Sequence, residues 1–319
     1  MNYYVICPWA ETGGPEALHQ LCSTLNDIGE NAFIYYHDGT NNFSQINRGQ
    51  VIEKYSQYNI KTCDVGSIEL LDSIENVIVI PEVFPIKVIE HFKNCKIIFW
   101  RLCIFTHGQE LTEQFFQKVY HGCQNDTQFN ILKESNLFNP KKYFMLTDYT
   151  NESYIIEEDQ LSTNRKRKIL YNPRKGLKHS RIIIDKLSGK DIEIVPIVGM
   201  TNEQIKKNIL ESKVYIDFGD HPGKDRIPRE CAIGGCVVIT GTQRCGANQI
   251  DIPINTKFEY NEYMDSYNYD EISEFVLNVL DNYAYYFKDQ ESYRDIIRKE
   301  KETFKNEVID MINIVTGGL

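Results

Sequence analysis

The sequence lacks several patterns that would assign it to common protein classes. No CxxC pair occurs among its nine cysteines, which leaves neither a zinc site of the usual spacing nor a thioredoxin-type motif. No run approaches the roughly 18 consecutive apolar residues that a membrane-spanning helix needs. GxSxG, HExxH and DxD motifs are also absent. This excludes a nucleophile elbow and a zinc-protease motif, and it disfavours a metal-dependent transferase.

Positive charge is also in short supply. The 319 residues contain 35 Lys and Arg against 45 Asp and Glu, a formal net charge of −10. A protein that binds nucleic acid needs a surplus of cations for the phosphates, so we expect no nucleic-acid partner. The acidic total allows at most peripheral contact with a membrane surface. With 42% hydrophobic and 25% charged residues, the composition is that of an ordinary globular protein.

The cysteines are odd in number and lie mostly in apolar contexts. This favours reduced, buried thiols and a cytoplasmic location. The first residues have no charged region ahead of the short apolar run Tyr3–Cys7, and Glu11 follows soon after it. We therefore interpret this run as a first β-strand and not as a signal peptide.

Short apolar runs alternate with helical patterns along the chain. Continuous apolar strands separated by helices predict a parallel sheet covered on both faces. The first half is expected to contain, in chain order, strand 3–7, helix 16–27, strand 32–36, strand 77–80, helix 85–92, strand 96–100, helix 113–120 and strand 144–146.

The alternation restarts after a polar and acidic segment near residues 150–165, where we place a domain boundary. The second half is expected to contain strand 168–171, a helix to residue 187, strand 193–195, helix 202–211, strand 214–218, helix 228–233, strand 236–240 and helical sequence from residue 270. The predicted fold class is therefore α/β, with two Rossmann-like domains, 1–157 and 165–319, facing a cleft. The pattern leaves open whether the last helices pack back on the N-terminal domain.

Three segments stand where a strand meets a helix, which is the edge of an α/β sheet that binds ligands. The first contains Gly13 and Gly14, followed by Pro15. Two glycines let the backbone approach a ligand closely, and the helix start offers free N–H groups. The segment is not a GxGxxG fingerprint. Its alternative interpretation is a glycine-rich turn before a proline-started helix.

The second segment is a block of eight Lys and Arg between Asn164 and Ile184 that contains no acid. In a chain of negative net charge this asymmetry is informative. We interpret Arg165–Lys168 as a solvated linker. Lys175 lies beside Gly176 in a strand-to-helix turn and is better placed to bind a phosphate at the helix N-terminus.

The third segment, residues 217–240, is the strongest. A strand ends in a glycine-bearing loop, and a short helix follows that closes on paired glycines. The cations of this segment, together with helix N–H groups, can neutralise a diphosphate leaving group without a metal. Glu230 can accept hydrogen bonds from a ribose diol. The alternative is that Asp225 and Glu230 only pair with neighbouring arginines on a surface loop. The cations are Lys224, Arg226 and Arg229.

With the tandem Rossmann pattern, this segment resembles the donor-binding half of GT-B glycosyltransferases, which are two-domain nucleotide-sugar enzymes of bacterial surface polysaccharide assembly. Retaining members contain an E-x7-E segment of the form EGFGLPxLEAMAxGxPVI. Its second half resembles residues 228–239: Glu230, Gly235 and Val238-Ile239 stand at matching positions, and Pro228 and Ala232 lie one position from their counterparts.

The resemblance implies roles for individual residues. Glu230 would be the ribose-binding second glutamate, and Lys175-Gly176 would hold the donor diphosphate. Gly13-Gly14 would lie near the transferred sugar. The N-terminal domain would bind the acceptor and the C-terminal domain the nucleotide-sugar.

Two positions depart from the family pattern. Pro222 stands where the first glutamate is expected, and Leu170 stands where an arginine precedes the lysine. Retention or inversion of the sugar therefore stays open. Asp225 is the candidate catalytic carboxylate. His107, after strand 96–100, is the candidate base for the acceptor hydroxyl, with a structural role as its alternative.

The resulting hypothesis is a metal-independent glycosyltransferase without a cofactor. It would move a sugar from a nucleotide-sugar to a glycan or lipid-linked glycan in capsule, lipopolysaccharide or glycoconjugate synthesis. The alternatives are a sugar-nucleotide epimerase of the same architecture and a non-catalytic GT-B-like binding partner. The sequence leaves open the donor, the acceptor, the linkage and whether the chain forms a homo-oligomer. The candidate donor-binding residues are Gly13, Gly14, Lys175, Gly176, Lys224, Arg226, Arg229 and Glu230.

Overall fold

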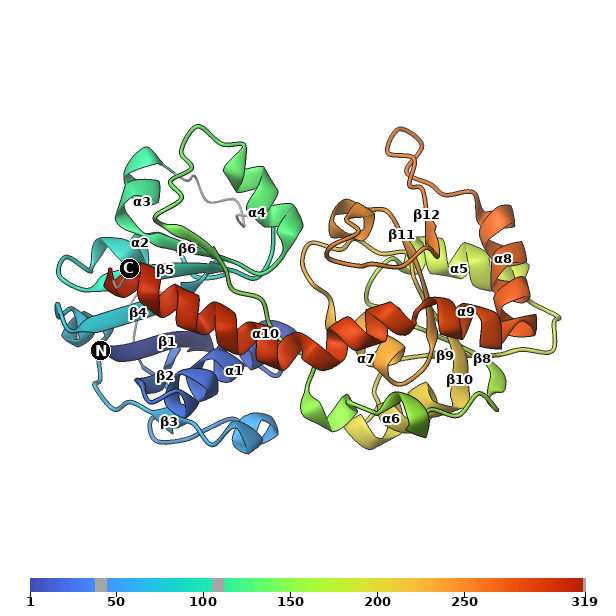
Figure 1. The fold of residues 1–319 in the computed structure, drawn as a ribbon, viewed down its shortest axis with the longest axis horizontal. Coiled ribbons are helices and arrows are strands. Elements are labelled where there is room, and N and C mark those ends of the chain that lie inside the picture. The colour runs from blue at the N-terminus through green and yellow to red at the C-terminus, as the bar shows by residue number, and fades with distance from the viewer. Residues whose placement is uncertain (38–44, 105–111, 318–319) are drawn as a thin grey trace. The chain divides into compact units, whose positions relative to one another are not determined.

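The computed structural model describes residues 1–37, 45–104 and 112–317. The chain divides into two compact units. The first unit contains residues 1–149 and 301–319, and the second contains residues 150–300. Each unit is an α/β structure built around a parallel sheet (Figure 1).

The described part of the first unit contains a seven-stranded sheet in the order β3-β2-β1-β4-β5-β6-β7. Every neighbouring pair is parallel. The strands are rich in β-branched and aromatic residues, which suit a pleated, buried surface. Their bounds are β1 (Asn2–Pro8), β2 (Asn31–His37), β3 (Lys61–Thr62), β4 (Asn76–Pro81), β5 (Lys96–Arg101), β6 (Tyr120–Cys123) and β7 (Tyr143–Met145).

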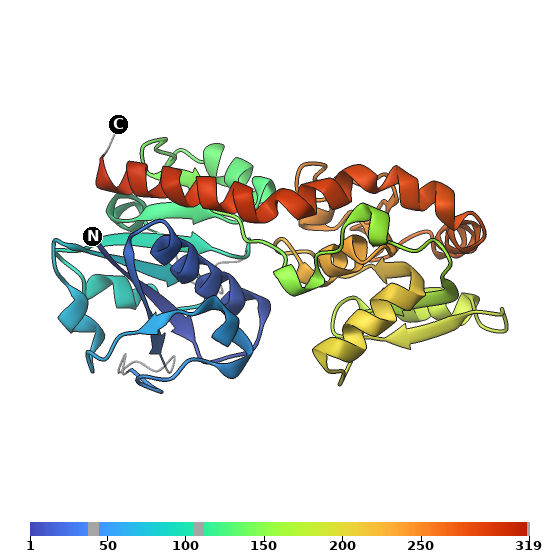
Figure 2. The same ribbon diagram turned by 60° about the horizontal axis from the view of Figure 1, so that its bottom comes forward.

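Successive residues of a strand point to opposite faces of the sheet, so apolar side chains emerge on both faces. Helices cover each face and bury these side chains in two separate cores. On one face, Val5 packs with apolar side chains of α1 (Gly13–Asp27) and with the C-terminal part of α10 (Glu291–Thr316). Figure 2 shows this part of α10 in red along the sheet. On the other face, Ile6 belongs to a separate core with α2 (Lys87–Glu90) and α3 (Glu113–Lys118). The remaining elements of this unit are η1 (Glu53–Tyr58), η2 (Ile68–Leu71) and α4 (Asp126–Lys133).

The second unit contains a five-stranded parallel sheet in the order β12-β11-β10-β8-β9. The chain runs from β8 to its neighbour β9, and then crosses back to β10 on the other side of β8. The order of strands therefore reverses between β8 and β10, which is a topological switch point. The strands are β8 (Lys166–Tyr171), β9 (Glu193–Pro196), β10 (Ser212–Asp217), β11 (Val237–Gly241) and β12 (Lys257–Phe258).

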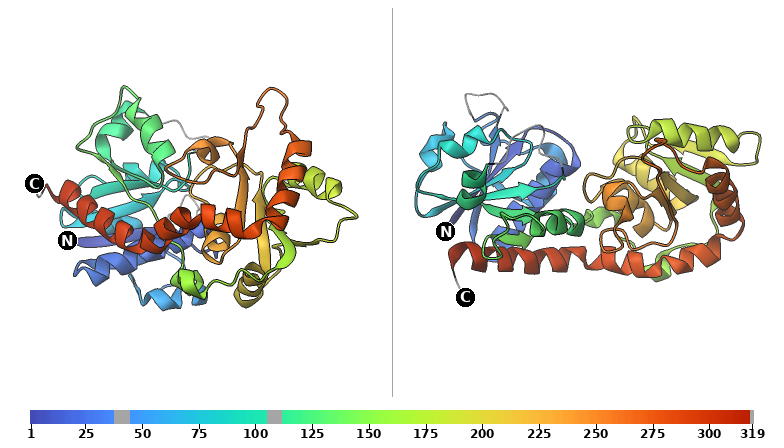
Figure 3. Two further views of the ribbon diagram at one scale, coloured as in Figure 1. Left: turned by 45° about the vertical axis from the view of Figure 1, so that its right-hand side comes forward. Right: turned by 90° about the horizontal axis from the view of Figure 1, so that it is seen from above.

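The helices of the second unit also form two layers. Ile216 lies in a core with α5 (Leu177–Lys186) and α8 (Tyr269–Asp281), which lie side by side on one face (Figure 3). Tyr215 points the other way, into a core with α6 (Asn202–Glu211), α7 (Arg226–Ile233) and the first turns of α10. The remaining elements are η3 (Glu152–Tyr154), η4 (Glu158–Gln160), η5 (Arg244–Ala247) and α9 (Tyr283–Asp289).

The predicted fold class is confirmed, since both halves are parallel α/β structures. Three expected elements differ in detail. The first helix begins at Gly13 and not at Glu16, so both glycines lie in its first turn. The helix expected over 85–92 is only four residues long. Tyr120, expected at the end of a helix, begins the unpredicted strand β6.

The interpretation of Arg165–Lys168 as a solvated linker is wrong. Arg165 is 8% exposed, and its guanidinium donates hydrogen bonds to the carbonyl oxygens of Ile209, Ser212 and Gly234. A fork of fixed N–H groups suits several carbonyls at once. Lys168 is also buried, and it is ion-paired with Glu193 and Glu211 at 3.0 and 3.3 Å. Arg165 and Lys168 therefore fasten strand β8 into the sheet, whereas the Lys166 side chain is exposed.

The predicted state of the cysteines is confirmed for most of them. All nine are free thiols, and all but Cys95 and Cys103 are buried. Across the residues that the structure describes, no helix has the length and apolar character required to cross a bilayer.

Candidate functional site

The strongest candidate site lies in the second unit at the carboxyl ends of β8 and β10. These neighbouring strands flank the topological switch point, where open α/β sheets bind ligands. The loop 172–176 leaves β8 and leads to α5, and the loop 218–225 leaves β10 and leads to α7. Four candidate residues from the sequence lie in these two loops, and a fifth, Arg226, follows the second loop directly. The four are Lys175, Gly176, Lys224 and Asp225.

A backbone contact joins these two loops. Gly176 has φ +59, and a Cβ on it would lie 2.5 Å from the backbone nitrogen of Gly219. A Cβ on Gly219 would in turn lie 2.9 Å from the Cβ of Lys175. Such distances are too short for any side chain, so glycine is required on both loops. The contact fixes Lys175 against the loop that follows β10.

The N-terminus of α5 is free to bind an anion. Gly176 is its N-cap, no side chain caps it, and its first turn contains no acid. The first N–H groups of a helix have no partner within the helix. Together with the helix dipole they favour a negative group such as a phosphate. Lys175, immediately before this N-cap, is 33% exposed and can supply a full positive charge.

Asp225 links two cations at this edge of the sheet. Its Oδ1 is ion-paired with Lys175, and its Oδ2 lies 2.9 Å from His221 Nδ1. His221 is completely buried, and its Nε2 lies 3.9 Å from Asp217 Oδ1. Both carboxylate oxygens of Asp225 are therefore engaged. Lys175, Asp225 and His221 come from the two loops that the glycine contact joins.

The charges of this cluster stabilise one another. Burial opposes the charging of His221, but the negative charges of Asp217 and Asp225 outweigh it and raise the pKa of His221. Burial also opposes the ionisation of Asp225, but His221 and Lys175 outweigh it and lower the pKa of Asp225. We conclude that Asp225 is a carboxylate at neutral pH and not a proton donor.

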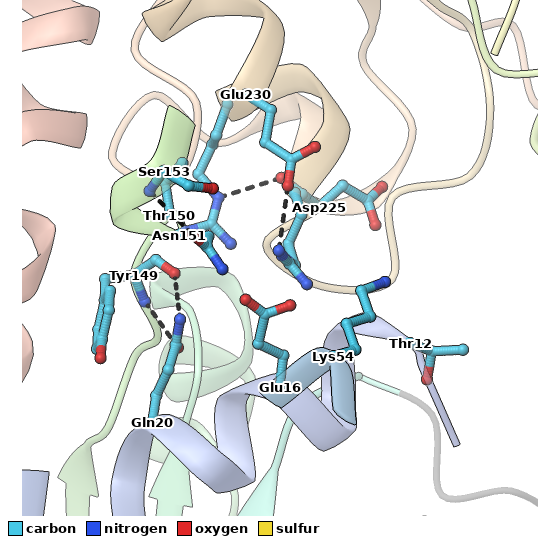
Figure 4. Close-up of polar contacts among 12 residues, drawn as sticks. Thr12, Glu16, Gln20, Lys54, Tyr149, Thr150, Asn151, Ser153, Asp225 and Glu230 are labelled. Atoms are coloured by element: carbon cyan, nitrogen blue, oxygen red, sulfur yellow. Dashed lines mark hydrogen bonds and ion pairs between the residues drawn. The ribbon is translucent and has the colours of Figure 1, made fainter. Parts of the chain in front are cut away.

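Helix α7 carries the second carboxylate of the site. Asp225 is its N-cap, and Glu230 lies one turn further along (Figure 4). Glu230 is 6% exposed. Its Oε1 accepts a hydrogen bond of 3.1 Å from Arg226 Nη2 on the preceding turn. The two side chains form a pair at i and i+4, a spacing that places them on one helix face.

The two other predicted cations meet a carboxylate that sequence reasoning missed. Arg229 is 1% exposed, and its Nη1 lies 3.0 Å from Glu300 Oε2. Lys224 Nζ lies 2.9 Å from Glu300 Oε1. Arg229 also donates to the carbonyl oxygens of Lys224 and Asp225. It therefore holds the loop 218–225 in place from the inside.

Sequence reasoning had little access to these partners. Glu300 lies 71 residues after Arg229, in a helix whose pattern is helical and charged throughout. The sequence signal for His221 is its position four residues before Asp225 and four after Asp217, a spacing that can bring both carboxylates to the imidazole.

The remaining candidates lie in the first unit or outside the described residues. Gly13 and Gly14 form the first turn of α1, whose N-cap Thr12 makes no side-chain cap. A Cβ on Gly14 would make an ordinary contact of 3.6 Å with Leu102 Cδ1. Packing therefore does not require glycine at position 14. His107 lies outside the residues that the structure describes.

The described residues contain no group of three or more His, Cys, Asp or Glu that could hold a metal ion.

Comparison with known proteins identifies the fold. No family model matches the chain. No curated protein matches it either. Solved structures do: a glycosyltransferase from Rickettsia africae ESF-5 has a TM-score of 0.68 at 13% identity, covering 100% of this chain and 99% of the other.

Two further structures are similar over 100% of both chains. Sucrose-phosphate synthase from Thermosynechococcus elongatus has a TM-score of 0.69 at 11% identity. WaaG, a glycosyltransferase involved in lipopolysaccharide biosynthesis, has a TM-score of 0.56 at 10% identity. The chain thus has the GT-B fold of glycosyltransferases, as the resemblance in its sequence implied.

Proposed function

We propose that this chain is a glycosyltransferase that moves a sugar from a nucleotide-sugar donor to a glycan acceptor. The observation that carries the proposal is the position of Lys175 beside the uncapped N-terminus of α5, at the switch point of the second unit. The GT-B fold supports it, although a fold alone does not determine an activity.

In this proposal the donor diphosphate binds at the N-terminus of α5. Lys175 and the free N–H groups stabilise the negative charge that grows on the departing diphosphate, without a metal ion. Lys224, on the neighbouring loop, and Arg226, at the start of α7, add further positive charge. Gly176 and Gly219 matter because their close contact holds Lys175 against the loop that follows β10.

Asp225 acts through its neighbours. Both of its oxygens are engaged, one by Lys175 and one by His221. It therefore orients the lysine that meets the phosphate and keeps the local charge balanced. Arg229 positions the same loop through its hydrogen bonds to the carbonyl oxygens of Lys224 and Asp225, and its ion pair with Glu300 fixes the arginine.

Glu230 is the proposed ligand of the donor ribose. A carboxylate on a helix can accept hydrogen bonds from both hydroxyls of a diol, as acidic residues do in Rossmann sites. Its pairing with Arg226 holds the carboxylate in a fixed orientation on the helix. Gly13 and Gly14 are proposed to border the transferred sugar in the first unit.

We further propose a glycan or lipid-linked glycan acceptor and a role in surface polysaccharide synthesis at the cytoplasmic side. The likeness to WaaG, a glycosyltransferase involved in lipopolysaccharide biosynthesis, supports this choice of acceptor class.

A thermal-shift panel of UDP, GDP, CMP and TDP tests the donor site. One nucleotide is expected to raise the melting temperature, because a ligand that binds only the folded state stabilises it. Lys175→Met should weaken its binding about tenfold or more, the usual loss for a hydrogen bond to a charged group. Lys178→Met is the control, since this exposed lysine lies on the same helix and pairs with Asp265. If no nucleotide stabilises the chain, the proposal fails.

Product analysis then separates the alternatives. Release of nucleoside diphosphate that depends on an acceptor indicates a transferase. An isomerised sugar formed without acceptor indicates an epimerase. Nucleotide binding without turnover, across acceptors of several classes, indicates a non-catalytic partner.

A further inference from the structure

Arg101 is a buried cation of the first unit that none of the preceding roles uses. It is the last residue of β5 and is 4% exposed. Its Nε and Nη2 are buried, and neither has a hydrogen-bond partner among the residues that the structure describes. No carboxylate of the described residues forms an ion pair with it. Buried charges are normally paired, so this guanidinium lacks a partner that its burial demands.

Arg101 is held by contacts with aromatic rings and not by an ion pair with a carboxylate of the described residues. Its Cζ lies 5.1 Å from the ring centroid of Phe99 and 5.7 Å from that of Phe116. Such contacts engage the face of a guanidinium. They leave the N–H groups, which lie in its plane, available to an acceptor. The rings therefore orient the group without satisfying its hydrogen bonds.

Tyr143 places a second unsatisfied donor in the same surroundings. It lies in the neighbouring row of rings, 4.4 Å from the ring centroid of His121, which in turn stacks 5.1 Å from Phe116. Its buried hydroxyl has no hydrogen-bond partner among the residues that the structure describes. Burial raises the pKa of Tyr143 to about 12, against the opposing charge of Arg101. The hydroxyl thus keeps its proton and can donate it.

Glu82, at the end of the neighbouring strand β4, compensates the positive charge of Arg101 only weakly. Glu82 follows β4, beside β5, and its Oε2 accepts a hydrogen bond of 2.8 Å from the backbone N–H of Leu102. Burial raises the pKa of Glu82 to about 7, although the backbone and Arg101 oppose this. Near neutral pH this carboxyl is therefore only partly ionised. The positive charge of Arg101 is left largely unbalanced.

We propose that Arg101 and Tyr143 bind a compact anionic group, a phosphate or a carboxylate, on the face of the first sheet that α3 covers, where Arg101 and the His121 ring both lie against Phe116. A guanidinium matches the oxygens of such a group with two parallel N–H donors. That the acceptor carries this anionic group rests on the proposed function. The anion site itself does not depend on it.

The first test uses the full chain with inorganic phosphate and with acetate, measured by calorimetry and thermal unfolding. Arg101→Met is expected to weaken anion binding tenfold or more, and Arg48→Met, at an exposed arginine of the same unit, should not. The variants are also made on a Lys175→Met background, which removes the cation of the second unit. An affinity that Arg101→Met leaves unchanged would overturn the proposal.

Tyr143→Phe keeps the test valid if the arginine variant fails to fold. The change removes a hydroxyl without a hydrogen-bond partner, so folding should be unaffected. Anion affinity is expected to fall a few-fold, and no fall would count against the site. Without anion, Arg101→Met should melt at a higher temperature than the natural chain, because an uncompensated buried charge is removed.

A second test identifies the source of the anion. A hexose, a hexuronic acid and a hexose phosphate are titrated into the natural chain and into Arg101→Met. Tighter binding of the uronic acid or of the phosphate, lost in the variant, assigns a carboxylate or a phosphate to the acceptor. Equal binding of all three sugars would overturn the acceptor assignment. Failure of nucleotide binding would instead reject the proposed transferase and leave the phosphate and acetate results standing.

Discussion

Thr150 donates two hydrogen bonds to Glu300. Its backbone N–H lies 2.8 Å and its Oγ1 2.9 Å from the same oxygen, Oε2. These are the first and last residues of the second unit, so the chain enters and leaves that unit at one point. The same carboxylate is ion-paired with Arg229 and Lys224. One buried acid thus fastens the ends of the unit to the loop that precedes α7.

Removing the charge of Glu300 should destabilise the second unit. Burial opposes the ionisation of Glu300, but Arg229 and Lys224 outweigh it and lower its pKa. Glu300→Gln leaves both cations without their counter-charge, and breaking a buried pair in this way costs roughly 3 to 5 kcal/mol. Denaturant unfolding should show this loss. Glu302→Gln is the control, because Glu302 is an exposed residue of α10 two positions after Glu300. It should change the free energy of unfolding by less than about 0.5 kcal/mol.

Gly176→Ala should be far more costly than the same change at a comparable glycine. Both Gly176 and Gly189 have positive φ, +59 and +76, but only Gly176 faces backbone atoms within 2.6 Å. Gly189→Ala should lose about 1 kcal/mol from backbone strain alone. Gly176→Ala should lose roughly 3 kcal/mol, since steric overlap adds to the strain. Equal losses in denaturant unfolding would show that the two loops can separate freely.

The buried histidine predicts a specific dependence of stability on pH. Neighbouring carboxylates raise the pKa of His221 above its ordinary value of 6.5. Its charge therefore stabilises the fold fully below about pH 6.5, and this contribution disappears as the pH rises through the raised value. The stability difference between the natural chain and His221→Gln should be constant at acid pH and shrink above it. Parallel curves would contradict the prediction, and His91→Gln, at an exposed histidine, is the control.

Glu230→Ala should weaken nucleotide binding about tenfold, because a hydrogen bond to a charged group is lost. A 2′-deoxynucleotide provides the sharper measurement by calorimetry. Removal of the 2′-hydroxyl should reduce affinity for the natural chain but not for Glu230→Ala, since the partner of that hydroxyl is already missing. Glu274→Gln on α8 serves as the exposed acidic control. Additive losses from the two changes would reject the ribose role.

The sequence revealed most of the strands because a buried parallel strand is a continuous apolar run, as in Val77–Ile80. It concealed β6, whose residues Tyr120–Cys123 form no such run. Gly122 lies there because a Cβ would come within 3.2 to 3.3 Å of Phe144, Leu146 and Trp100. Side chains distant in the sequence leave little room for a side chain at this position. The residues around Gly122 in the sequence do not indicate this crowding.

The candidate site was predictable to a similar extent. Lys175 and Glu230 could be recognised because loop glycines and a helix start mark them locally. Their ion-pair partners could not be assigned, since pairing depends on which strand ends become neighbours. Arg165 shows the same limit: four basic residues in a row resemble a solvated stretch, yet the fold surrounds this one with carbonyl oxygens.

Helix α10 has a consequence for how the protein is made. Phe304, Val308, Met311 and Val315 belong to the core around β1, so residues 1–149 cannot complete their interior until residue 315 has been translated. The second unit needs nothing beyond residue 300. Domains generally mature in the order of synthesis, but here residues 150–300 can finish folding before residues 1–149.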